Sequence, residues 1–226
     1  MSAAHVQESI EAVGSKYDPE KMMIAREQTR SAIHQIAEAI KPGMVEEDAV
    51  EMAKDILADL GLLRGWHDVF VRFGVNTTKT YGAASEPGIV LGTDDIFFVD
   101  IGPVWKDWEG DGGETFLTGN DPEKARCAKD TREIFEEVRQ CWLTTGATGK
   151  ELYEFAVAAS ERRGWVFDMD LSGHRLADFP HAVVYEGSMA GVDFRPGNLL
   201  WVLEIHIRSA DNRFGAFFED ILMEHD

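Results

Sequence analysis

The stretch LWVLEIHIRSADNRFGAFFEDIL, residues 200–222, decides the fold class of this chain. It contains two runs of β-branched, aromatic and other apolar residues, which is typical of buried strands. The residues between the runs, 210–213, include Asp and Asn and suit a tight hairpin turn. If Ala210 faces Arg213 across that turn, the register places Glu204 directly opposite Glu219. The sequence therefore predicts two antiparallel strands with facing carboxylates.

Acidic side chains on strands that otherwise look buried are the most informative feature of the sequence. Cross-strand neighbours lie about 5 Å apart, where like charges repel, and unpaired carboxylates among apolar residues are costly to desolvate. Asp100, which ends the apolar run 96–100, and Asp111 form a second such pair. Because the basic residues nearby lie toward the turns, we expect one or two divalent cations to bind the four carboxylates. The alternative is that some of these acids are exposed at a sheet edge.

Three histidines near these strands are candidates for the same site. His174 follows Gly173, which permits close approach of the backbone, and His181 lies seven residues further along the chain. His206 comes two residues after Glu204, so on a strand it would face the same side and could line a pocket. For each of them, a packed and hydrogen-bonded polar residue is the alternative interpretation.

The chain as a whole predicts two halves of the same design. Helix signals span residues 18–40 and 46–60, and strand signals follow at 67–75, 95–101 and 113–117. Helices return from residue 121 to Gly146 and on to Gly164, and strands return from residue 165. A shift of 103 residues brings Gly43 onto Gly146 and Gly61 onto Gly164. We therefore expect one domain of two related halves, each pairing helices with a largely antiparallel sheet, although any two helical hairpins could share such a pattern.

Composition excludes several classes of function. The 226 residues include 22 basic and 41 acidic ones, for a net charge of −19, which disfavours binding to nucleic acid or to an anionic membrane. The apolar stretches are far shorter than the roughly 18 residues of a membrane span, and residues 1–5 lack the layout of a signal peptide. We expect a cytoplasmic protein whose two cysteines are reduced.

Together these features resemble the pita-bread metallohydrolases, the family of methionine aminopeptidase, Xaa-Pro aminopeptidase, prolidase and creatinase. The resemblance extends from about Asp18 to Glu224 and includes the helix end Lys41-Pro42-Gly43-Met44 and the segment VRFGVN, residues 71–76. It implies an α+β pita-bread fold, in which two pseudo-symmetric halves of paired helices pack on a curved, largely antiparallel sheet. Residues 1–17 would form an N-terminal extension, and residues 18–226 a single metallohydrolase domain.

The resemblance also implies a set of metal ligands. The five ligands of the family carry over, in chain order, to Asp100, Asp111, His174, Glu204 and Glu219. They would hold two divalent metal ions (Mn, Co, Zn or Fe) with Asp111 and Glu219 bridging, and oxygen-rich ligation with one imidazole suits such ions. Glu204 would also move the proton of the attacking water, and His181 would contact the substrate and the tetrahedral intermediate.

The implied function is a hydrolase that cleaves an amide bond in a peptide or a small amino-acid derivative through a metal-activated water. The family also suggests a homodimer. Two departures from the family make Tyr81 and His206 candidate substrate-pocket residues: Tyr81 lies near the position of another family histidine, and Ile205-His206 replaces Pro-Gly after the fourth ligand. The alternatives are a non-peptide C–N hydrolase of the creatinase type, a lyase on the same centre, or a non-catalytic binding relative.

Overall fold

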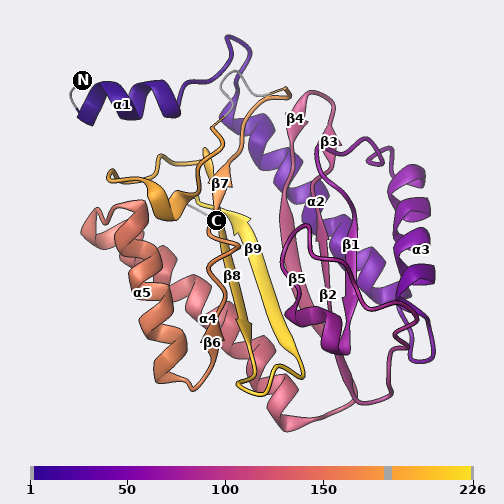
Figure 1. Cartoon of the computed structure of the whole chain (residues 1–226). Helices are drawn as coiled ribbons and strands as arrows, with labels where there is room; N and C mark the ends of the chain where they lie inside the picture. Colours follow the sequence, from indigo (N-terminus) through magenta and orange to yellow (C-terminus); the bar gives the residue numbers. More distant parts are fainter. Residues whose placement is uncertain (1–2, 181–184, 225–226) are drawn as a thin grey trace.

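Paired helices and an antiparallel sheet make up the molecule (Figure 1). The computed structural model describes residues 3–180 and 185–224. Its helices are α1 (Ala3–Ile10), α2 (Pro19–Ala39), α3 (Glu46–Asp59), α4 (Pro122–Thr145) and α5 (Gly149–Arg162), with 3-10 helices η1 (Gly74–Thr78) and η2 (Met189–Gly191). Its strands are β1 (Phe70–Phe73), β2 (Asp95–Ile101), β3 (Val104–Trp105), β4 (Trp108–Glu109), β5 (Gly112–Thr118), β6 (Val166–Phe167), β7 (His174–Arg175), β8 (Trp201–Arg208) and β9 (Gly215–Ile221). Within these two ranges, no helix has the length and apolar character needed to cross a bilayer.

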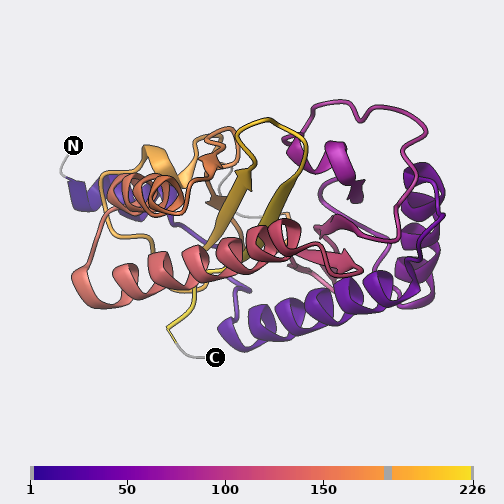
Figure 2. The ribbon, with the colours of Figure 1, turned by 90° about the horizontal axis from the view of Figure 1, so that it is seen from below.

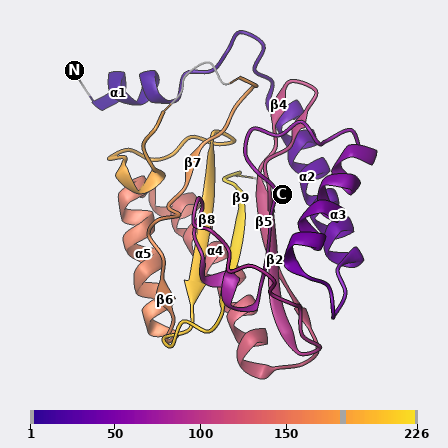
Figure 3. The same ribbon diagram turned by 45° about the vertical axis from the view of Figure 1, so that its right-hand side comes forward.

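One antiparallel sheet joins the two halves of the chain. Its strands follow the order β1-β2-β5-β9-β8-β6, and β7 pairs with β8. The first half supplies β1, β2 and β5, and the second supplies β9, β8 and β6, so the halves meet where β5 lies beside β9 (Figure 3). Gly113 of β5 faces Glu219 of β9 at this place, which we call the central seam. Residues of both halves come together there.

The two halves repeat the same sequence of elements, as the sequence predicts. Each has a long helix, a second helix of 14 residues, and then strands. Gly43, Gly61, Gly146 and Gly164 lie at or just after the four helix ends, and all four have a positive φ, between 70° and 93°. Side chains rarely adopt this conformation, so glycine favours the ends of α3, α4 and α5 at Gly61, Gly146 and Gly164. α2 instead ends with Ile40 in an extended conformation, and Gly43 lies in the turn before α3.

Local sequence signals explain where the helices begin. Asp18 and Asp121 each precede a proline, and their carboxylates accept hydrogen bonds from backbone N–H groups of the first turn of α2 and α4. At the start of α5, Thr148 and Glu151 form a reciprocal capping box. Each such cap contributes about 1 kcal/mol, and the helix starts predicted at Asp18 and Asp121 are confirmed.

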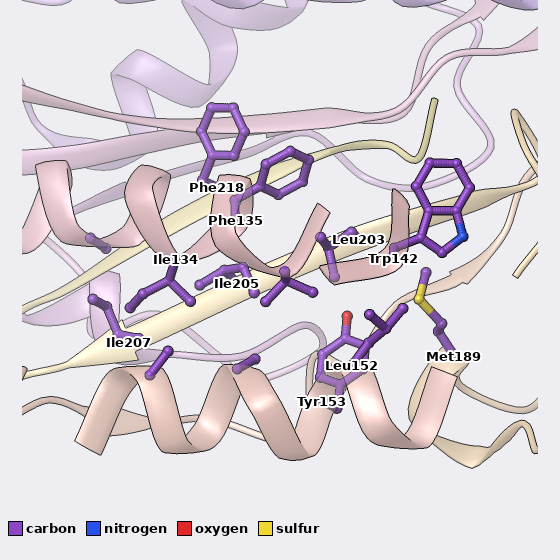
Figure 4. Close-up of a cluster of buried hydrophobic side chains, with 14 of the residues drawn as sticks. Ile134, Phe135, Trp142, Leu152, Tyr153, Met189, Leu203, Ile205, Ile207 and Phe218 are labelled. Carbon is purple, nitrogen blue, oxygen red and sulfur yellow. The ribbon is translucent and has the colours of Figure 1, made fainter. Parts of the chain in front are cut away.

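Each half packs its helices onto its own part of the sheet around a hydrophobic core. In the second half, side chains of α4 and α5 such as Trp142 and Leu152 meet Leu203 and Ile205 of β8 and Phe218 of β9 (Figure 4). A corresponding core lies between α2, α3, β1 and β2, and Figure 2 shows α2 and α4 along the same face of the sheet. Since side chains alternate along a strand, the residues between these core positions point to the opposite face.

The first strand of the sheet is shorter than the sequence predicts. Strand signals cover residues 67–75, but β1 contains only Phe70–Phe73, and η1 follows it. Gly74 has a φ of 49°, a conformation that ends an extended strand. His67 therefore lies in the connection before β1. The direction of its side chain there does not follow the alternation of side chains along a strand.

The segment before Asp18 is held against the second half. It contains α1, which was not predicted from the sequence. Glu11 Oε1 accepts hydrogen bonds from Trp201 Nε1 at 2.7 Å and from the Gly197 N–H at 2.6 Å. Arg175 Nε donates to the Ile10 carbonyl at 2.9 Å. These bonds tie residues 3–17 to the strands that carry half of the site.

Candidate metal centre

The four acids predicted from the strands converge at the central seam. Asp100 lies in β2, Asp111 directly precedes β5, Glu204 lies in β8 and Glu219 lies in β9. The register places Glu204 opposite Glu219, as predicted from the hairpin turn. Asp100 and Glu219 both face Gly113, on either side of β5. Acids of both halves are thereby brought to one point, on the sheet face opposite the two hydrophobic cores.

His174 is brought to the same point by a short strand. β7 pairs with β8 at His174 and Val202, and His174 Nε2 lies 3.0 Å from Asp111 Oδ2 and 3.7 Å from Glu219 Oε1. The preceding Gly173 has a φ of 73°, and its N–H donates to Glu204 Oε2 at 2.6 Å. The close backbone approach predicted for this glycine is confirmed.

His67 is a member of the cluster that sequence reasoning missed. Its Nε2 lies 3.1 Å from Asp111 Oδ1 and 3.7 Å from Asp100 Oδ1, and its side chain is only 7% exposed. No motif in the sequence marks it; the pairing of β1 with β2, which sets Phe70 opposite Asp100, brings it to the cluster. That register places residues just before β1 near the acid end of β2.

Burial and close contacts shift the charges of the cluster. Burial raises the pKa of Asp100 to about 7 and that of Glu219 well above its usual value. Burial also acts on Asp111, but its contacts with His174 and His67 outweigh burial and lower its pKa. Three buried carboxylate oxygens have no hydrogen-bond donor among the described residues, namely Asp100 Oδ1, Asp111 Oδ2 and Glu219 Oε2. Buried oxygens of this kind are expected to have a partner.

The donor set fits a divalent cation. Donor atoms of His67, Asp100 and Asp111 all lie within 4.8 Å of one another, and those of Asp111, His174 and Glu219 do the same. Carboxylate oxygens mixed with imidazole nitrogen suit Mn, Fe, Co and Zn ions. A cation would also supply a partner for the three oxygens that accept no hydrogen bond from the described residues. Both groups share Asp111, which therefore lies at the middle of the cluster.

A cavity of about 420 Å³ opens onto the cluster. Asp100, His174, Glu204 and Glu219 form part of its wall. Aromatic and acidic side chains form another part, namely Trp66, Tyr81, Tyr185, Asp170 and Glu186. Within residues 3–180 and 185–224, no lysine or arginine contributes to this lining. The cavity is therefore acidic beyond the candidate metal ligands themselves.

The remaining predicted site residues lie at different distances from this cavity. Tyr81 lines it, and its ring makes an edge contact with His67 at 6.1 Å between centroids. His206 is fully buried beside Phe98 and Phe217. Its Nε2 lies 2.8 Å from the Thr77 carbonyl oxygen. It is not among the residues that line the cavity. Burial lowers the pKa of His206. His181 lies outside the described residues.

The halves, the seam and the ligand cluster define the class of pita-bread metallohydrolases. The chain matches Metallopeptidase family M24 over residues 20–224, so it belongs to this family. The predicted family and the metallohydrolase class are therefore confirmed. In sequence, no curated protein matches the chain.

Solved structures of this family share the fold. A prolidase from Pyrococcus horikoshii OT3 is 19% identical with a TM-score of 0.75, over 97% of this chain and 63% of that one. An X-Pro aminopeptidase from Thermotoga maritima MSB8 is 22% identical with a TM-score of 0.73, over 97% of this chain and 61% of that one. A methionine aminopeptidase from Thermotoga maritima is 18% identical with a TM-score of 0.70, over 95% of this chain and 97% of that one. The predicted α+β pita-bread fold is confirmed, and the chain spans less than two thirds of the length of that prolidase and that X-Pro aminopeptidase.

Proposed function

We propose that this protein is a dinuclear-metal-dependent hydrolase of the Xaa-Pro aminopeptidase/prolidase type, which cleaves an amide bond in a peptide or a small amino-acid derivative. The observation that carries the proposal is the convergence of acids and imidazoles around Asp111, with three carboxylate oxygens left without a hydrogen-bond donor among the described residues. Membership of the M24 family supports the hydrolytic chemistry. A homodimer in the cytoplasm stays a prediction from the sequence.

The ions would be held by Asp100, Asp111, His174, Glu204 and Glu219. When bound, divalent metals lower the pKa of water and polarise a carbonyl group. Residues of the chain itself would hold the reacting groups in place and transfer protons to and from them. The Gly173 N–H fixes Glu204 by its Oε2, which leaves Oε1 to exchange a proton with the reacting groups.

The environment of Glu204 supports its proposed role in proton transfer. Without metal, burial raises its pKa above the usual value of 4.5, and a bound cation would lower it again and keep the carboxylate charged, ready to accept a proton. Tyr153 holds the backbone of this residue, because its hydroxyl donates to the Glu204 carbonyl and accepts from the Glu204 N–H, both at 3.1 Å. We further propose that His181 contacts the substrate.

The lining of the cavity supports a substrate with a positively charged end. Asp170 and Glu186 are exposed acids on its wall, which the rings of Trp66, Tyr81 and Tyr185 also line. Carboxylates attract an ammonium group, and aromatic faces bind cations as well. A free substrate carboxylate would meet no described lysine or arginine in this wall. The cavity thus favours recognition of a free amino terminus over recognition of a free carboxyl terminus.

A non-peptide C–N hydrolase of the creatinase type is the second candidate. The same acidic and aromatic wall would also accept a small guanidinium or amine compound. Tyr81 supports this candidate, since it provides a phenol near the position where peptidases of the family were expected to have a histidine.

Turnover of matched substrates tests the proposal. The protein, loaded in turn with Mn, Co, Zn and Fe, is given tripeptides whose amino terminus is free or acetylated and whose carboxyl terminus is free or amidated. We expect hydrolysis of peptides with a free amino terminus and little effect of amidation. The Asp111→Asn variant serves as the control and should be inactive. Metal-loaded protein that hydrolyses neither these peptides nor small guanidinium compounds would contradict a hydrolase.

A further inference from the structure

His67 and His174 hold equivalent positions on the two sides of Asp111. The Nδ1–H of His67 donates to the Asp68 carbonyl at 2.6 Å, and that of His174 donates to the Arg175 carbonyl at 2.9 Å. A carbonyl can only accept, so in both rings Nδ1 carries the proton and Nε2 faces the carboxylates. The two Nε2 atoms lie 3.1 Å and 3.0 Å from different oxygens of Asp111. Each ring therefore has the orientation of a metal-binding histidine.

The segment that delivers His67 is fixed by its own hydrogen bonds. Gly65 forms a β-bridge with Pro103, and the backbone N–H of Trp66 donates to the Gly102 carbonyl at 3.0 Å. The indole Nε1 of Trp66 donates to the Gly110 carbonyl at 2.9 Å, next to Asp111. This anchoring sets the position of His67 before any ligand binds.

Neighbouring side chains restrict the imidazole further. A Cβ at Gly102 would overlap the His67 ring, so glycine leaves the space that this ring fills. The Trp66 ring makes edge contacts with both imidazoles, with centroids 4.7 Å from His67 and 5.1 Å from His174. The two histidines are thus held at a fixed separation around Asp111, and neither is a loosely placed surface residue.

We propose that His67 is a sixth metal ligand, which binds through Nε2 the ion nearest Asp100. Beside Glu204, the centre then contains two groups of one imidazole and two carboxylates, His67 with Asp100 and Asp111, and His174 with Asp111 and Glu219. Asp100 Oδ1, which has no hydrogen-bond donor among the described residues, lies 3.7 Å from His67 Nε2. This inference rests on the proposed two-ion centre and changes its composition.

A second imidazole changes which ion the site prefers. Nitrogen donors favour Co and Zn over Mn more strongly than carboxylate oxygens do. An Nε2 ligand on each ion therefore predicts that both positions have a higher affinity for Co and Zn than for Mn. Replacing His67 should weaken this preference at one position and leave it at the other.

Metal titration of histidine variants tests the assignment. Wild-type protein and the His67→Ala, His67→Gln and His174→Ala variants are titrated with Co(II) and with Zn(II), by calorimetry and by the visible absorption of Co(II). His34→Ala is the matched control, since His34 is half exposed on α2 and pairs with Glu114. We expect two equivalents in the wild type and the control. Each His67 variant should bind one ion at least about 100-fold more weakly and show a changed Co(II) spectrum.

The outcomes separate this inference from the proposed function. Wild-type protein that binds fewer than two ions would overturn the two-ion centre. Wild-type protein with two ions, and a His67→Ala variant that binds both with unchanged affinity and spectrum, would overturn only the role of His67. Thermal unfolding of each metal-free variant checks that it folds. If metal binding is unchanged but KM rises, His67 is a substrate-binding residue, and the ligand assignment is wrong.

Discussion

Glu204 and Glu219 face each other across β8 and β9, and both are almost fully buried, at 7% and 2% exposure. Facing carboxylates repel each other, and burial raises the pKa of both. No lysine or arginine forms an ion pair with either of them among the described residues. The folded chain thus holds unfavourable electrostatic interactions at the central seam that a bound cation would relieve.

Removal of metal should lower the stability of the protein. A ligand that binds only the folded state at 100 times its Kd stabilises that state by about 2.7 kcal/mol, which for a chain of this size raises Tm by roughly 5–10 °C. We expect this difference between samples with Mn or Co and samples with a chelator, measured by calorimetry. Glu219→Gln should abolish the difference, whereas Glu51→Gln on the exposed face of α3 should keep it. Equal Tm values with metal and with chelator would contradict a metal site at the seam.

The stability of the metal-free protein should fall as pH rises from about 4 to 7. In the folded chain Asp100 has a pKa of about 7, because burial disfavours its charged form, against 3.8 as its ordinary value. Between these values the folded state keeps a proton that the unfolded state has released. Stability then decreases with pH, by up to about 1.4 kcal/mol per pH unit.

Denaturant unfolding at several pH values measures this slope. Asp100→Asn cannot titrate, so its stability should vary less over this range than that of the wild type. A wild-type stability that rises between pH 5 and pH 7 more steeply than that of the variant would show that Asp100 is charged in the folded, metal-free protein.

The acids of the site could be predicted because strand register is local information. The turn at 210–213 sets Glu204 against Glu219, and the glycine before His174 signals close packing of the backbone. His67 could not be found in this way, because its position depends on the docking of residues 64–67 against residues 102–104 and on the pairing of β1 with β2. These are contacts between separate segments, and no spacing in the sequence encodes them.

His206 shows the opposite case, in which a correct local rule does not determine the surroundings. Strand alternation sets it on the same side as Glu204. One step along β8, however, η1 covers the sheet, and His206 Nε2 meets the carbonyl oxygen of Thr77 in η1. The 3-10 helix begins at Gly74, inside the predicted strand 67–75, and continues to Thr78, so its position over His206 was not expected.

Gly173→Ala should weaken metal binding as well as stability. The backbone of Gly173 has a φ of 73°, and a Cβ there would lie 2.6 Å from the Val202 carbonyl oxygen. Relief of this overlap must move the N–H that binds Glu204 Oε2. Gly164→Ala is the matched control, since Gly164 has a φ of 80° and open space around its Cα.

In both glycine variants the free energy of unfolding should fall by about 1–2 kcal/mol because of the left-handed backbone alone. Denaturant unfolding measures this change. Only Gly173→Ala should lose more than this and also bind Co(II) more weakly in titrations. If the two variants have equal stability and equal metal affinity, the Gly173–Glu204 contact does not support the site.

Reversal of charge at the cavity wall should change recognition of the amino terminus. Glu186 is an exposed acid of the lining, and Glu186→Lys would place a positive charge where a substrate ammonium group is expected to bind. A change of about 1.4 kcal/mol in binding corresponds to a tenfold change in KM. For peptides with a free amino terminus we expect KM to rise about tenfold with kcat little changed, and for acetylated peptides we expect no such rise.

Glu51→Lys on α3 changes the net charge by the same amount and controls for long-range attraction. A rise in KM that is equal in the two variants, or equal for free and acetylated peptides, would show that Glu186 does not recognise the amino group.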